Sequence, residues 1–423
     1  MDYRRRIIDA ELDELMRSLP AIALEGPKGV GKTATASRRA DLVVSLDVPA
    51  MLELISADPG WPDASEGTVL VDEWQRHPPT WDHIRRQVDA GAQAGRYLLT
   101  GSAVPAEAPS HSGAGRIVAL RMRPLSLAER ELTEPTVSLH DLLSGRRPDI
   151  RGSSPVDLPM YVDEILASGF PAIRRLEGRA RRAQLSGYIA RVVEHDFPEQ
   201  GLRVRRPGTL RAWLTAYAAA TATTASYNTV LRAATAGEGD KPARTTTTAY
   251  RDVLSQLWLL DPLPGWVPGR YHINKLTQAP KHHLADPALA AQLVGVDAGA
   301  LMSGTETGPP VPRDGTLLGH LFESLATLSV RVYAQANEAT VAHLRTQNGS
   351  REVDLVVERP DQRVVALEVK LAASPDAESV AHLRWLRERL GDDLLDAVVL
   401  TTGAHAYRRS DGIAVVPAAL LGP

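Results

Sequence analysis

An eight-residue block near the N-terminus constrains this chain more than any other feature. Gly26-Pro27-Lys28-Gly29-Val30-Gly31-Lys32-Thr33 fits the spacing G-x-x-x-x-G-K-[S/T] at every fixed position and follows the short apolar run Ala21–Leu24. The glycines let backbone N–H groups turn inward around phosphate groups, and a helix starting at Lys32 adds the partial positive charge of its N-terminus. The strand–loop–helix order predicts a loop that binds a nucleoside triphosphate.

The side chains of this block have separate expected roles. All of its residues are expected to contact ATP: Gly26, Pro27, Lys28, Gly29, Val30, Gly31, Lys32 and Thr33. Lys32 is long enough to reach the β- and γ-phosphates and stabilise the transferred group, and the Thr33 hydroxyl can ligate Mg²⁺. We therefore expect ATP and Mg²⁺ as the cofactors.

A second motif supports the first. The apolar run Thr68–Val71 ends in Asp72 and Glu73, as a buried strand ending in two carboxylates would. Asp72 is expected to hold Mg²⁺, and Glu73 to orient and deprotonate the attacking water. The alternative is a helix cap or a solvated loop.

Further polar groups lie after the next expected strand and just before the one that follows it. Thr100 and Ser102, after Tyr97–Leu99, can place a hydroxyl near the γ-phosphate. Arg116, in a glycine-rich segment, is expected to stabilise transition-state charge in its own chain or in a neighbouring subunit of a homo-oligomer. The alternative for Arg116 is a solvated side chain.

Length and composition set the frame for these motifs. A chain of 423 residues is too long for one core, and its alternating strands and helices over 21–130 predict a parallel sheet covered on both faces. We expect an α/β multidomain protein with a P-loop ATPase domain over 1–135, a helical connector over 136–200, a helical, winged-helix-like basic domain over 201–300 and a nuclease-like domain over 301–423. The sequence has no cysteine and no apolar run long enough for a membrane span, so we expect a cytoplasmic protein without a membrane partner.

The middle of the chain is basic although the whole is slightly acidic. Residues 201–283 hold eleven Lys and Arg against four acids, within a chain of net charge −3. Such a stretch predicts contact with nucleic-acid phosphates. Segments Leu257–Trp266 and Ala279–Leu284 are expected to pair as a hairpin after a helix, the order of a winged helix. The alternatives are a solvated basic face, an interface with the acidic domains, and an ordinary helical linker.

Near the C-terminus, a hairpin is expected to bring two carboxylates together. If the turn is centred on Asp361, Asp354 lies opposite Glu368, and both share a strand face with Lys370. Carboxylates this close favour a cation between them, so Asp354 and Glu368 are expected to hold Mg²⁺, with Glu323 from the preceding helix and with Lys370 acting on a bound water. Odd positions such as Leu355 are expected to form the buried face. The alternative is a polar, water-facing strand face on which Lys370 neutralises both acids.

Nearly the whole chain resembles a group of bacterial and archaeal AAA-type P-loop ATPases fused to a C-terminal domain of unknown function, whose end is similar to the restriction-endonuclease (PD-(D/E)xK) fold. The resemblance rests on the two motifs above and on short blocks: Leu99–Ser102, Gly115-Arg116, Arg123–Glu129, Ser168–Pro171, Lys281–Leu289, Gly319–Glu323, Arg351–Val356 and Leu367–Lys370. It implies nuclease-superfamily roles for Asp354, Glu368 and Lys370, with Glu323 from the helix. Lys28 replaces the arginine usual in that group, and Val353 replaces the proline of the nuclease motif.

Together these features predict a Mg²⁺-dependent ATPase whose nucleotide state controls a nucleic-acid-binding or nucleic-acid-cutting C-terminal half, by analogy in DNA processing or defence. The rival hypothesis is an ATP-dependent switch that binds a protein partner and keeps a catalytically idle nuclease fold.

Overall fold

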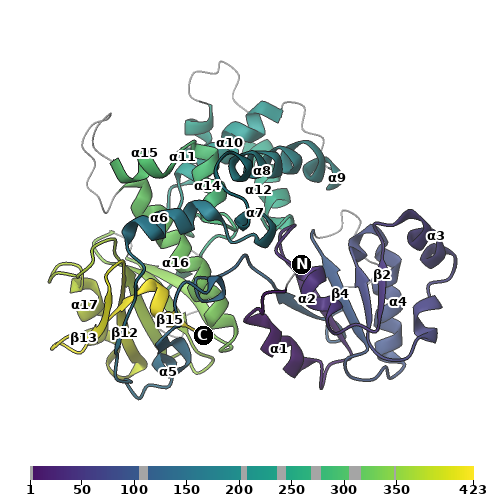
Figure 1. Cartoon of the computed structure of the whole chain (residues 1–423), viewed down its shortest axis with the longest axis horizontal. Helices are drawn as coiled ribbons and strands as arrows, with labels where there is room; N and C mark the ends of the chain where they lie inside the picture. Colours follow the sequence, from purple (N-terminus) through teal and green to yellow (C-terminus); the bar gives the residue numbers. More distant parts are fainter. Residues whose placement is uncertain are drawn as a thin grey trace.

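The computed structural model describes residues 3–103, 113–201, 207–235, 244–267, 278–303, 316–346 and 349–423. Figure 1 shows three bodies: an N-terminal α/β body on the right, a group of helices at the top and a C-terminal α/β body on the left. The long helix α16 (Leu317–Gln335) lies between the helical group and the C-terminal sheet.

The N-terminal body is built on a parallel sheet whose order is β2-β3-β4-β1-β5. Its strands are β1 (Ala21–Glu25), β2 (Leu42–Ser45), β3 (Val69–Asp72), β4 (Tyr97–Gly101) and β5 (Val118–Arg121). β3 and β4 are buried along their whole length, because helices cover both faces and every side chain must be apolar or satisfied. The parallel sheet predicted for this region is confirmed.

Strand order decides which side chains meet at the carboxyl edge of the sheet. β4 is inserted between β1 and β3, with Thr100 paired to Leu24 on one side and Asp72 on the other. The helices of this body are α1 (Ile8–Leu15), α2 (Lys32–Ser37), α3 (Pro49–Ala57) and α4 (Pro78–Asp89). The glycine loop between β1 and α2 therefore lies beside the ends of β3 and β4.

The middle of the chain is helical. Its main helices are α6 (Leu158–Ala167), α8 (Gly178–Arg191), α10 (Pro207–Ala219), α11 (Tyr227–Ala234), α12 (Arg244–Gln256) and α14 (Pro287–Val294). After α12, segments 259–263 and 281–285 pair antiparallel: Leu263 and Lys281 exchange two backbone hydrogen bonds of 2.9 Å, and Asp261 N–H donates to His283. We call these paired segments the junction ladder. The predicted pairing is confirmed, while its connection over 268–277 lies outside the described residues and the winged-helix assignment stays a prediction.

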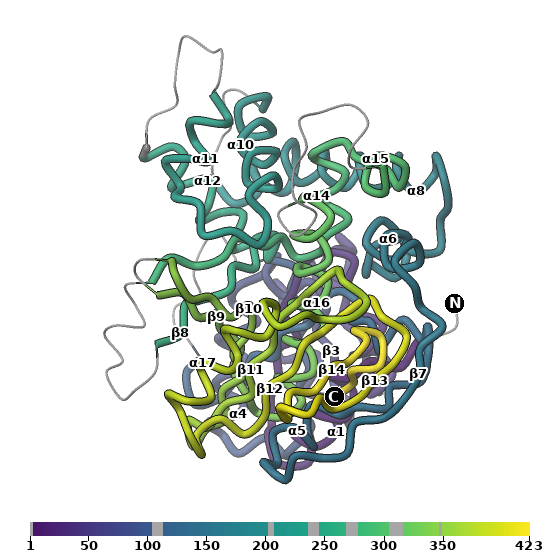
Figure 2. The backbone as a smooth tube through the Cα atoms, turned by 90° about the vertical axis from the view of Figure 1, so that its left-hand side faces the viewer, coloured from purple at the N-terminus to yellow at the C-terminus, as the bar shows by residue number. Residues whose placement is uncertain are grey.

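The C-terminal body contains a mixed sheet of order β7-β13-β14-β12-β11-β10-β9-β8, an order that Figure 2 shows from right to left. The central strands are β9 (Thr340–Arg345), β10 (Glu352–Glu358), β11 (Val364–Val369) and β12 (Leu394–Thr401). The outer strands are β7 (Gly152–Ser153), β8 (Gly265–Trp266), β13 (His405–Arg408) and β14 (Ala414–Pro417). Helices α16 and α17 (Ala381–Leu390) both contact β10 and β11.

The stretch 136–200 differs from the helical connector that we expected. Its first part forms β6 (Val137–Ser138), α5 (Leu139–Leu143) and β7 (Gly152–Ser153). β6 pairs with β15 (Leu421–Gly422), and β7 pairs with β13. These short segments give no periodic signal, because their strand identity comes from partners more than 250 residues away. The C-terminal body is therefore completed by chain that precedes the helical middle.

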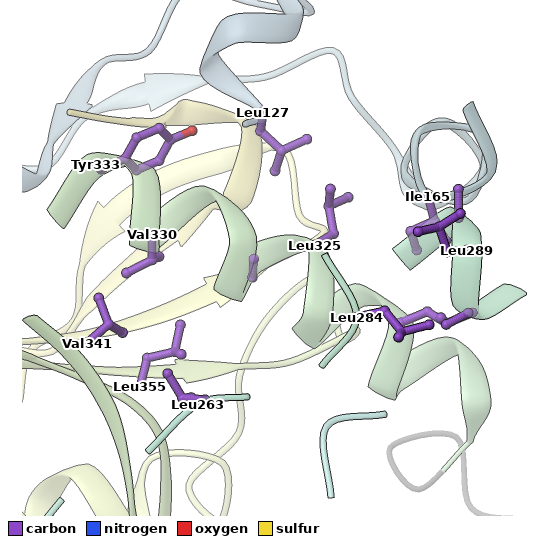
Figure 3. Packing of buried hydrophobic residues seen from close by; sticks show 14 of the residues in the cluster. Leu127, Ile165, Leu263, Leu284, Leu289, Leu325, Val330, Tyr333, Val341 and Leu355 are labelled. Carbon is purple, nitrogen blue, oxygen red and sulfur yellow. The ribbon is translucent and has the colours of Figure 1, made fainter. Parts of the chain in front are cut away.

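One apolar core runs through the junction of the three bodies. Figure 3 shows side chains gathered around α16, with Leu127 from the N-terminal body, Leu263 and Leu284 from the junction ladder, and Leu355 from β10. Hydrogen bonds fix the contact with α16, since Tyr333 Oη accepts from the N–H of Ala128 at 2.9 Å. Residues from all three bodies thus share buried apolar surface.

A buried carboxylate links the same three parts. Asp261 on the junction ladder pairs with Arg123, just after β5, at 2.8 Å, with Arg331 on α16 at 3.1 Å, and with Arg121 at 3.5 Å. Burial opposes ionisation of Asp261, but the three guanidinium groups outweigh it and hold the pKa of this carboxyl well below its ordinary range. Asp261 therefore carries its charge at neutral pH and connects the N-terminal body to the C-terminal body.

Asp261→Asn should destabilise the protein by about 3–5 kcal/mol, because it leaves guanidinium groups buried without their anion. Urea unfolding at pH 7 measures this loss. Asp149→Asn is the matched control, since Asp149 pairs with Arg151 on the surface, where the two side chains are 67% and 84% exposed. The wild type's advantage over Asp261→Asn should shrink below pH 4, as the Asp261 carboxyl loses its charge in the unfolded chain. Equal stability of the two variants at pH 7 would contradict this account.

Candidate functional site

The glycine loop has the backbone that its sequence predicts. Gly29 and Gly31 have φ values of 85° and 101°, and Gly31 forms the N-cap of α2. Gly26 packs so closely on the neighbouring chain that a Cβ there would overlap the carbonyl oxygen of Met122. Glycine is thus required by conformation at Gly29 and Gly31 and by space at Gly26.

Lys32 lies inside this loop. Its Nζ donates to the carbonyl oxygens of Gly26 at 2.8 Å and Pro27 at 3.0 Å, and the side chain is buried. Burial lowers the pKa of Lys32 to about 8, although the nearby charges of Glu73 and Asp72 favour the ammonium form. A phosphate group would supply the anionic partner that the Lys32 ammonium lacks in the loop.

Three polar side chains meet next to Lys32. Thr33 Oγ1 donates to Asp72 Oδ1 at 2.8 Å, and Thr100 donates to the same oxygen. Thr33 begins α2, Asp72 ends β3 and Thr100 lies near the end of β4, so the strand order brings them together. A hydroxyl and a carboxylate beside a phosphate loop are the ligand types that Mg²⁺ prefers, so Thr33 and Asp72 fit the predicted metal roles.

Glu73 is held in a specific position. Its backbone is in the left-handed region with φ 56°, which is uncommon for a residue with a side chain. Its Oε2 accepts from Ser102 Oγ at 3.0 Å and from the side-chain amide of Gln75. Ser102 therefore contacts Glu73 directly, while Gln75, which sequence reasoning missed, completes the contact from the turn after β3.

A cavity of about 380 Å³ opens beside Glu73 and Ser102. Its opposite wall is formed by Tyr188 of α8 and Asp196, the last residue of a π-helical turn, Val192–Asp196. Lys28 bridges the two walls, because its Nζ pairs with Asp196 at 3.1 Å and its carbonyl accepts from Tyr188 Oη at 3.2 Å. The helical middle thus contacts the glycine loop directly.

A buried arginine that sequence reasoning also missed braces the loop. Arg6 pairs with Glu129 at 2.9 Å, and it donates to the carbonyl oxygens of Val30 at 2.9 Å and Arg123 at 2.7 Å. The burial of Arg6 was hard to predict from the sequence, since an arginine that precedes an amphipathic helix is usually a surface residue. Glu129 belongs to the block Arg123–Glu129, whose role here is to position the glycine loop.

The structure places Arg116 away from the glycine loop of its own chain. Arg116 precedes β5, so it lies at the amino edge of the parallel sheet, whereas the loop lies at the carboxyl edge. Its guanidinium pairs with Asp89 at the end of α4 at 2.8 Å and is 47% exposed. A role within the same subunit does not fit this position, and a role in a neighbouring subunit stays a prediction.

The basic middle segment is only partly described. Six of its cations lie outside the described residues: Arg203, Arg205, Arg206, Lys241, Arg270 and Lys275. Arg211 and Arg232 are exposed, and Arg251 stacks on Tyr227 at 4.9 Å. Lys281 is a correction to the predicted phosphate-binding surface, because it is 1% exposed and points into the protein.

The C-terminal hairpin has the register predicted from its turn. Leu355 pairs with Leu367 and Val357 with Val365, a register centred on Asp361. The carboxylate of Asp354 accepts from the N–H of Val369 at 2.9 Å, and Lys370 pairs with Glu368 at 3.0 Å. Asp354, Glu368 and Lys370 therefore come together at the end of this strand pair.

Both faces of this hairpin are buried, which corrects the expectation that only the odd positions form a buried face and also contradicts the alternative of a water-facing polar face. Leu355 packs toward the core around α16, whereas Val356 packs into a second core with Leu383 of α17. A register shift against β9 between Val353 and Val356 moves Val353 into the second core. Asp354 and Glu368 are consequently 8% and 4% exposed, and their charges need partners inside the protein.

The main partner is Lys281 of the junction ladder. Its Nζ lies 2.8 Å from Glu323 of α16, 2.8 Å from Glu352 and 2.9 Å from Asp354 of β10. We call Glu323, Glu352, Asp354 and Glu368 the acidic cluster. Glu352 could have been found from the sequence, because it shares the even parity of Asp354 on one strand. Lys281 could not, since nothing local shows which distant acids it meets.

The acidic cluster holds more acids than bases. Four carboxyl groups share three cations, those of Lys281 and Lys370 and the guanidinium of Arg345, which lies 3.9 Å from Glu352. Burial and the charge of Asp354 raise the pKa of Glu323 to about 8, and the same two causes raise the pKa of Glu368 well above its usual range. Among the described residues, no group of three or more His, Asp or Glu side chains is arranged to hold a metal ion. Lys281 thus pairs with Glu323 and Asp354, two of the three carboxylates that were predicted to hold Mg²⁺.

Three family models match separate parts of the chain. Residues 18–131 match an AAA domain, residues 159–300 match a domain of unknown function (DUF8612) and residues 318–421 match another (DUF4143). The AAA match covers the parallel sheet and the glycine loop. The N-terminal body is therefore a P-loop ATPase domain in its fold, and residues 318–421 of the C-terminal body match a domain family without an assigned function.

Two mycobacterial proteins match along nearly the whole chain. The chain is 26% identical over 431 residues to the uncharacterized proteins Mb2031c of Mycobacterium bovis and Rv2008c of Mycobacterium tuberculosis, spanning 99% of this chain and 84% of each relative.

Solved structures give weak likenesses. The Walker-type ATPase PABY2304 of Pyrococcus abyssi has a TM-score of 0.41 and 16% identity, covering 67% of this chain and 94% of its own. DnaA of Aquifex aeolicus bound to AMPPCP has a TM-score of 0.27 and 14% identity, covering 60% and 89%. Scores this low carry no argument about function.

No helix in the described part of the chain is both long enough and apolar enough to cross a membrane.

The pKa of Lys32 gives a test of the nucleotide site. Because phosphate groups favour the ammonium form, nucleotide binding should raise this pKa above its value of about 8 in the free protein. The dissociation constant for ATP should then be nearly constant below pH 8 and rise above it, by up to about tenfold per pH unit. Fluorescence titration from pH 6.5 to 9.5 measures this, with Lys32→Arg as the non-titrating control. A wild-type profile that stays flat above pH 8, as that of Lys32→Arg should, would contradict the assignment.

Proposed function

We propose that the protein is a Mg²⁺-dependent ATPase that binds ATP at the glycine loop and hydrolyses it. The observation that carries this proposal is the convergence of Thr33, Asp72 and Thr100 beside Lys32, with Glu73 held by Ser102 one residue further along. These groups come from three separate sequence segments, and together they supply the parts that phosphoryl transfer to water requires.

The residues have separate tasks in this proposal. Backbone N–H groups of the loop and the Lys32 ammonium bind the β- and γ-phosphates, and Thr33 and Asp72 hold Mg²⁺, which would neutralise charge on the phosphate oxygens. Glu73 accepts the proton of a water in the adjoining cavity. Ser102 and Gln75 act as positioning residues, because they donate hydrogen bonds to the Glu73 carboxylate and so fix its direction.

Arg116 extends the proposal to an oligomer. Its place at the amino edge of the sheet supports a role in the active site of a neighbouring copy, where its guanidinium would stabilise charge on the transferred phosphoryl group. Release of Arg116 from Asp89 is then a condition for that contact.

We further propose that nucleotide state controls the C-terminal body. The glycine loop packs on Met122, and the residues on either side of Met122, Arg121 and Arg123, pair with Asp261 of the junction ladder. The other strand of that ladder carries Lys281, which pairs with Asp354 in the acidic cluster. A shift of the loop on ATP binding would be passed to the C-terminal body through these contacts. The restriction-endonuclease-like fold and its nuclease activity stay proposals that rest on the sequence resemblance.

The proposal has two versions, in which the partner of the protein is either nucleic acid or another protein. Contact with nucleic acid is supported by the charge of residues 201–283, and it requires an affinity that falls steeply with salt. The rival, an ATP-dependent switch for a protein partner, is favoured by Lys281, which fills the centre of the acidic cluster with a cation from the chain itself.

Glu73→Gln should lower ATP turnover by about 10²–10⁴-fold while leaving ATP binding intact, because the amide cannot accept the proton of water. Phosphate release and nucleotide titration measure the two properties. Ser102→Ala should cause a smaller loss of turnover, since Gln75 still holds Glu73. Glu66→Gln, at an exposed position of the same body, is the matched control and should behave as wild type. Turnover by Glu73→Gln equal to that of the control would refute Glu73 as the base.

A further inference from the structure

The helical middle contains a second cavity, of about 360 Å³, which lies among α10, α11 and α12 (Figure 2). This volume is within the range of pockets that take small organic groups. Among the described residues that line the cavity, none is acidic. The cavity beside Glu73 differs in this respect, because Asp196 and Glu199 also line it. The second cavity therefore suits a ligand that is neutral or negatively charged.

A continuous set of aromatic rings forms and supports one wall of this cavity. Between ring centroids, Tyr227 of α11 lies 5.0 Å from His282 of the junction ladder, and His282 lies 4.8 Å from Tyr217 of α10. Tyr217 in turn stacks on Trp213 at 5.3 Å. Trp213, Tyr217 and His282 are buried, whereas Tyr227 is only half-buried. Core packing thus holds the wall in place, and Tyr227 is the ring most open to a ligand.

A cation and neutral polar groups complete the cavity. The guanidinium of Arg251 on α12 lies 4.9 Å from the centre of the Tyr227 ring, and the Arg251 side chain is 37% exposed. Asp252 pairs with Arg251 at 3.3 Å, but an ion pair this exposed contributes little. Asn228 and Thr248 are exposed at the rim and carry hydrogen-bond donors and acceptors. Aromatic and guanidinium surfaces beside neutral polar groups are the surroundings in which a nucleobase binds.

A second arginine reaches the rim from the C-terminal body. Arg345, the last residue of β9, donates through Nη1 to Thr224 Oγ1 at 2.6 Å, and Thr224 precedes Ala225, which lines the cavity. The Arg345 side chain is 43% exposed, and Glu352 lies 3.9 Å from it, at the limit of an ion pair. Partly exposed guanidinium groups are good phosphate ligands. The cavity therefore has cations nearby for the phosphates that flank a base.

We propose that this cavity accepts one unpaired base of single-stranded nucleic acid, stacked on Tyr227, with Arg251 and Arg345 binding its phosphates. The inference rests on the nucleic-acid version of the proposed function, and it names the form of nucleic acid that the basic middle would bind. A base inside a duplex is stacked between its neighbours and cannot enter a cavity, whereas an unpaired base can. Stacking tolerates any sequence, because every base has a flat face.

Fluorescence anisotropy of the full chain with a labelled twelve-nucleotide oligothymidylate, in the absence of ATP, tests this proposal. Tyr227→Ala should weaken binding by about 5- to 100-fold, the usual loss when a stacked base loses its aromatic partner. Tyr227→Phe keeps the ring and should bind as wild type does. A duplex of the same length should bind more weakly than the single strand, and its affinity should not change in Tyr227→Ala.

Further variants separate loss of the site from unfolding. Thr248→Trp adds a ring at an exposed position of the cavity wall, so it should block the site and weaken single-strand binding as Tyr227→Ala does. Gln256→Trp, at an exposed position of the same helix away from the cavity lining, is the matched control and should bind as wild type does. Arg345→Ala should reduce the slope of log affinity against log salt concentration by about 1, because one phosphate contact is lost.

Three results would overturn the proposal, and they differ in what else they contradict. Equal single-strand affinity of wild type, Tyr227→Ala and Thr248→Trp would remove the base site but leave contact of the basic middle with nucleic acid intact. Failure to bind any nucleic acid would remove both. Thymidine monophosphate that binds as tightly as the oligothymidylate, and through Tyr227, would assign the cavity to a free nucleotide. None of these results bears on ATP turnover, which depends on Glu73 and the glycine loop.

Discussion

The carboxylate of Asp261 connects the N-terminal body, the junction ladder and α16 at one buried point. It is paired with three guanidinium groups, two beside β5 and one on α16, and its backbone belongs to the junction ladder. Apolar contacts are non-directional, so they hold bodies together without fixing their register. The Asp261 contacts have defined geometry, and they fix the junction ladder between the N-terminal body and the C-terminal sheet. The positions of both the cavity beside Glu73 and the acidic cluster depend on that register.

Buried charge is a recurrent device in this protein. Arg6 with Glu129 braces the glycine loop, Asp261 joins the bodies, and Lys281 enters the acidic cluster. Such pairs contribute little net stability compared with an apolar core, because desolvation offsets most of the attraction. Instead they raise the free energy of wrong arrangements, since displacement of either partner leaves an unpaired charge in the interior.

Local chemistry in the sequence was sufficient to predict much of the fold and the nucleotide site. The glycine loop, Asp72 and Thr100 could be predicted because each follows a strand, and parallel strands bring their carboxyl ends to one edge. The register of β10 and β11 followed from a turn centred on Asp361. These features depend on short-range geometry.

Features that depend on distant contacts could not be predicted in this way. The pairing of β7 with β13 and the burial of both faces of β10 are decided by elements far along the chain. Lys281 was counted as part of a basic surface, because its three acidic partners lie on α16 and β10, from 42 to 73 residues away. Gln75 escaped notice since its role depends on the left-handed turn at Glu73.

The central claim is that the junction ladder links the ATP site to the C-terminal body, and backbone hydrogen exchange tests it most directly. The Glu73→Gln variant, which should bind ATP without consuming it, can be compared with and without ATP and Mg²⁺. The account predicts that exchange at the amides of Asp261 and Lys281 shifts on the order of tenfold, within the usual range of coupling between sites. Protection confined to the glycine loop, with unchanged exchange at Asp261 and Lys281, would contradict it.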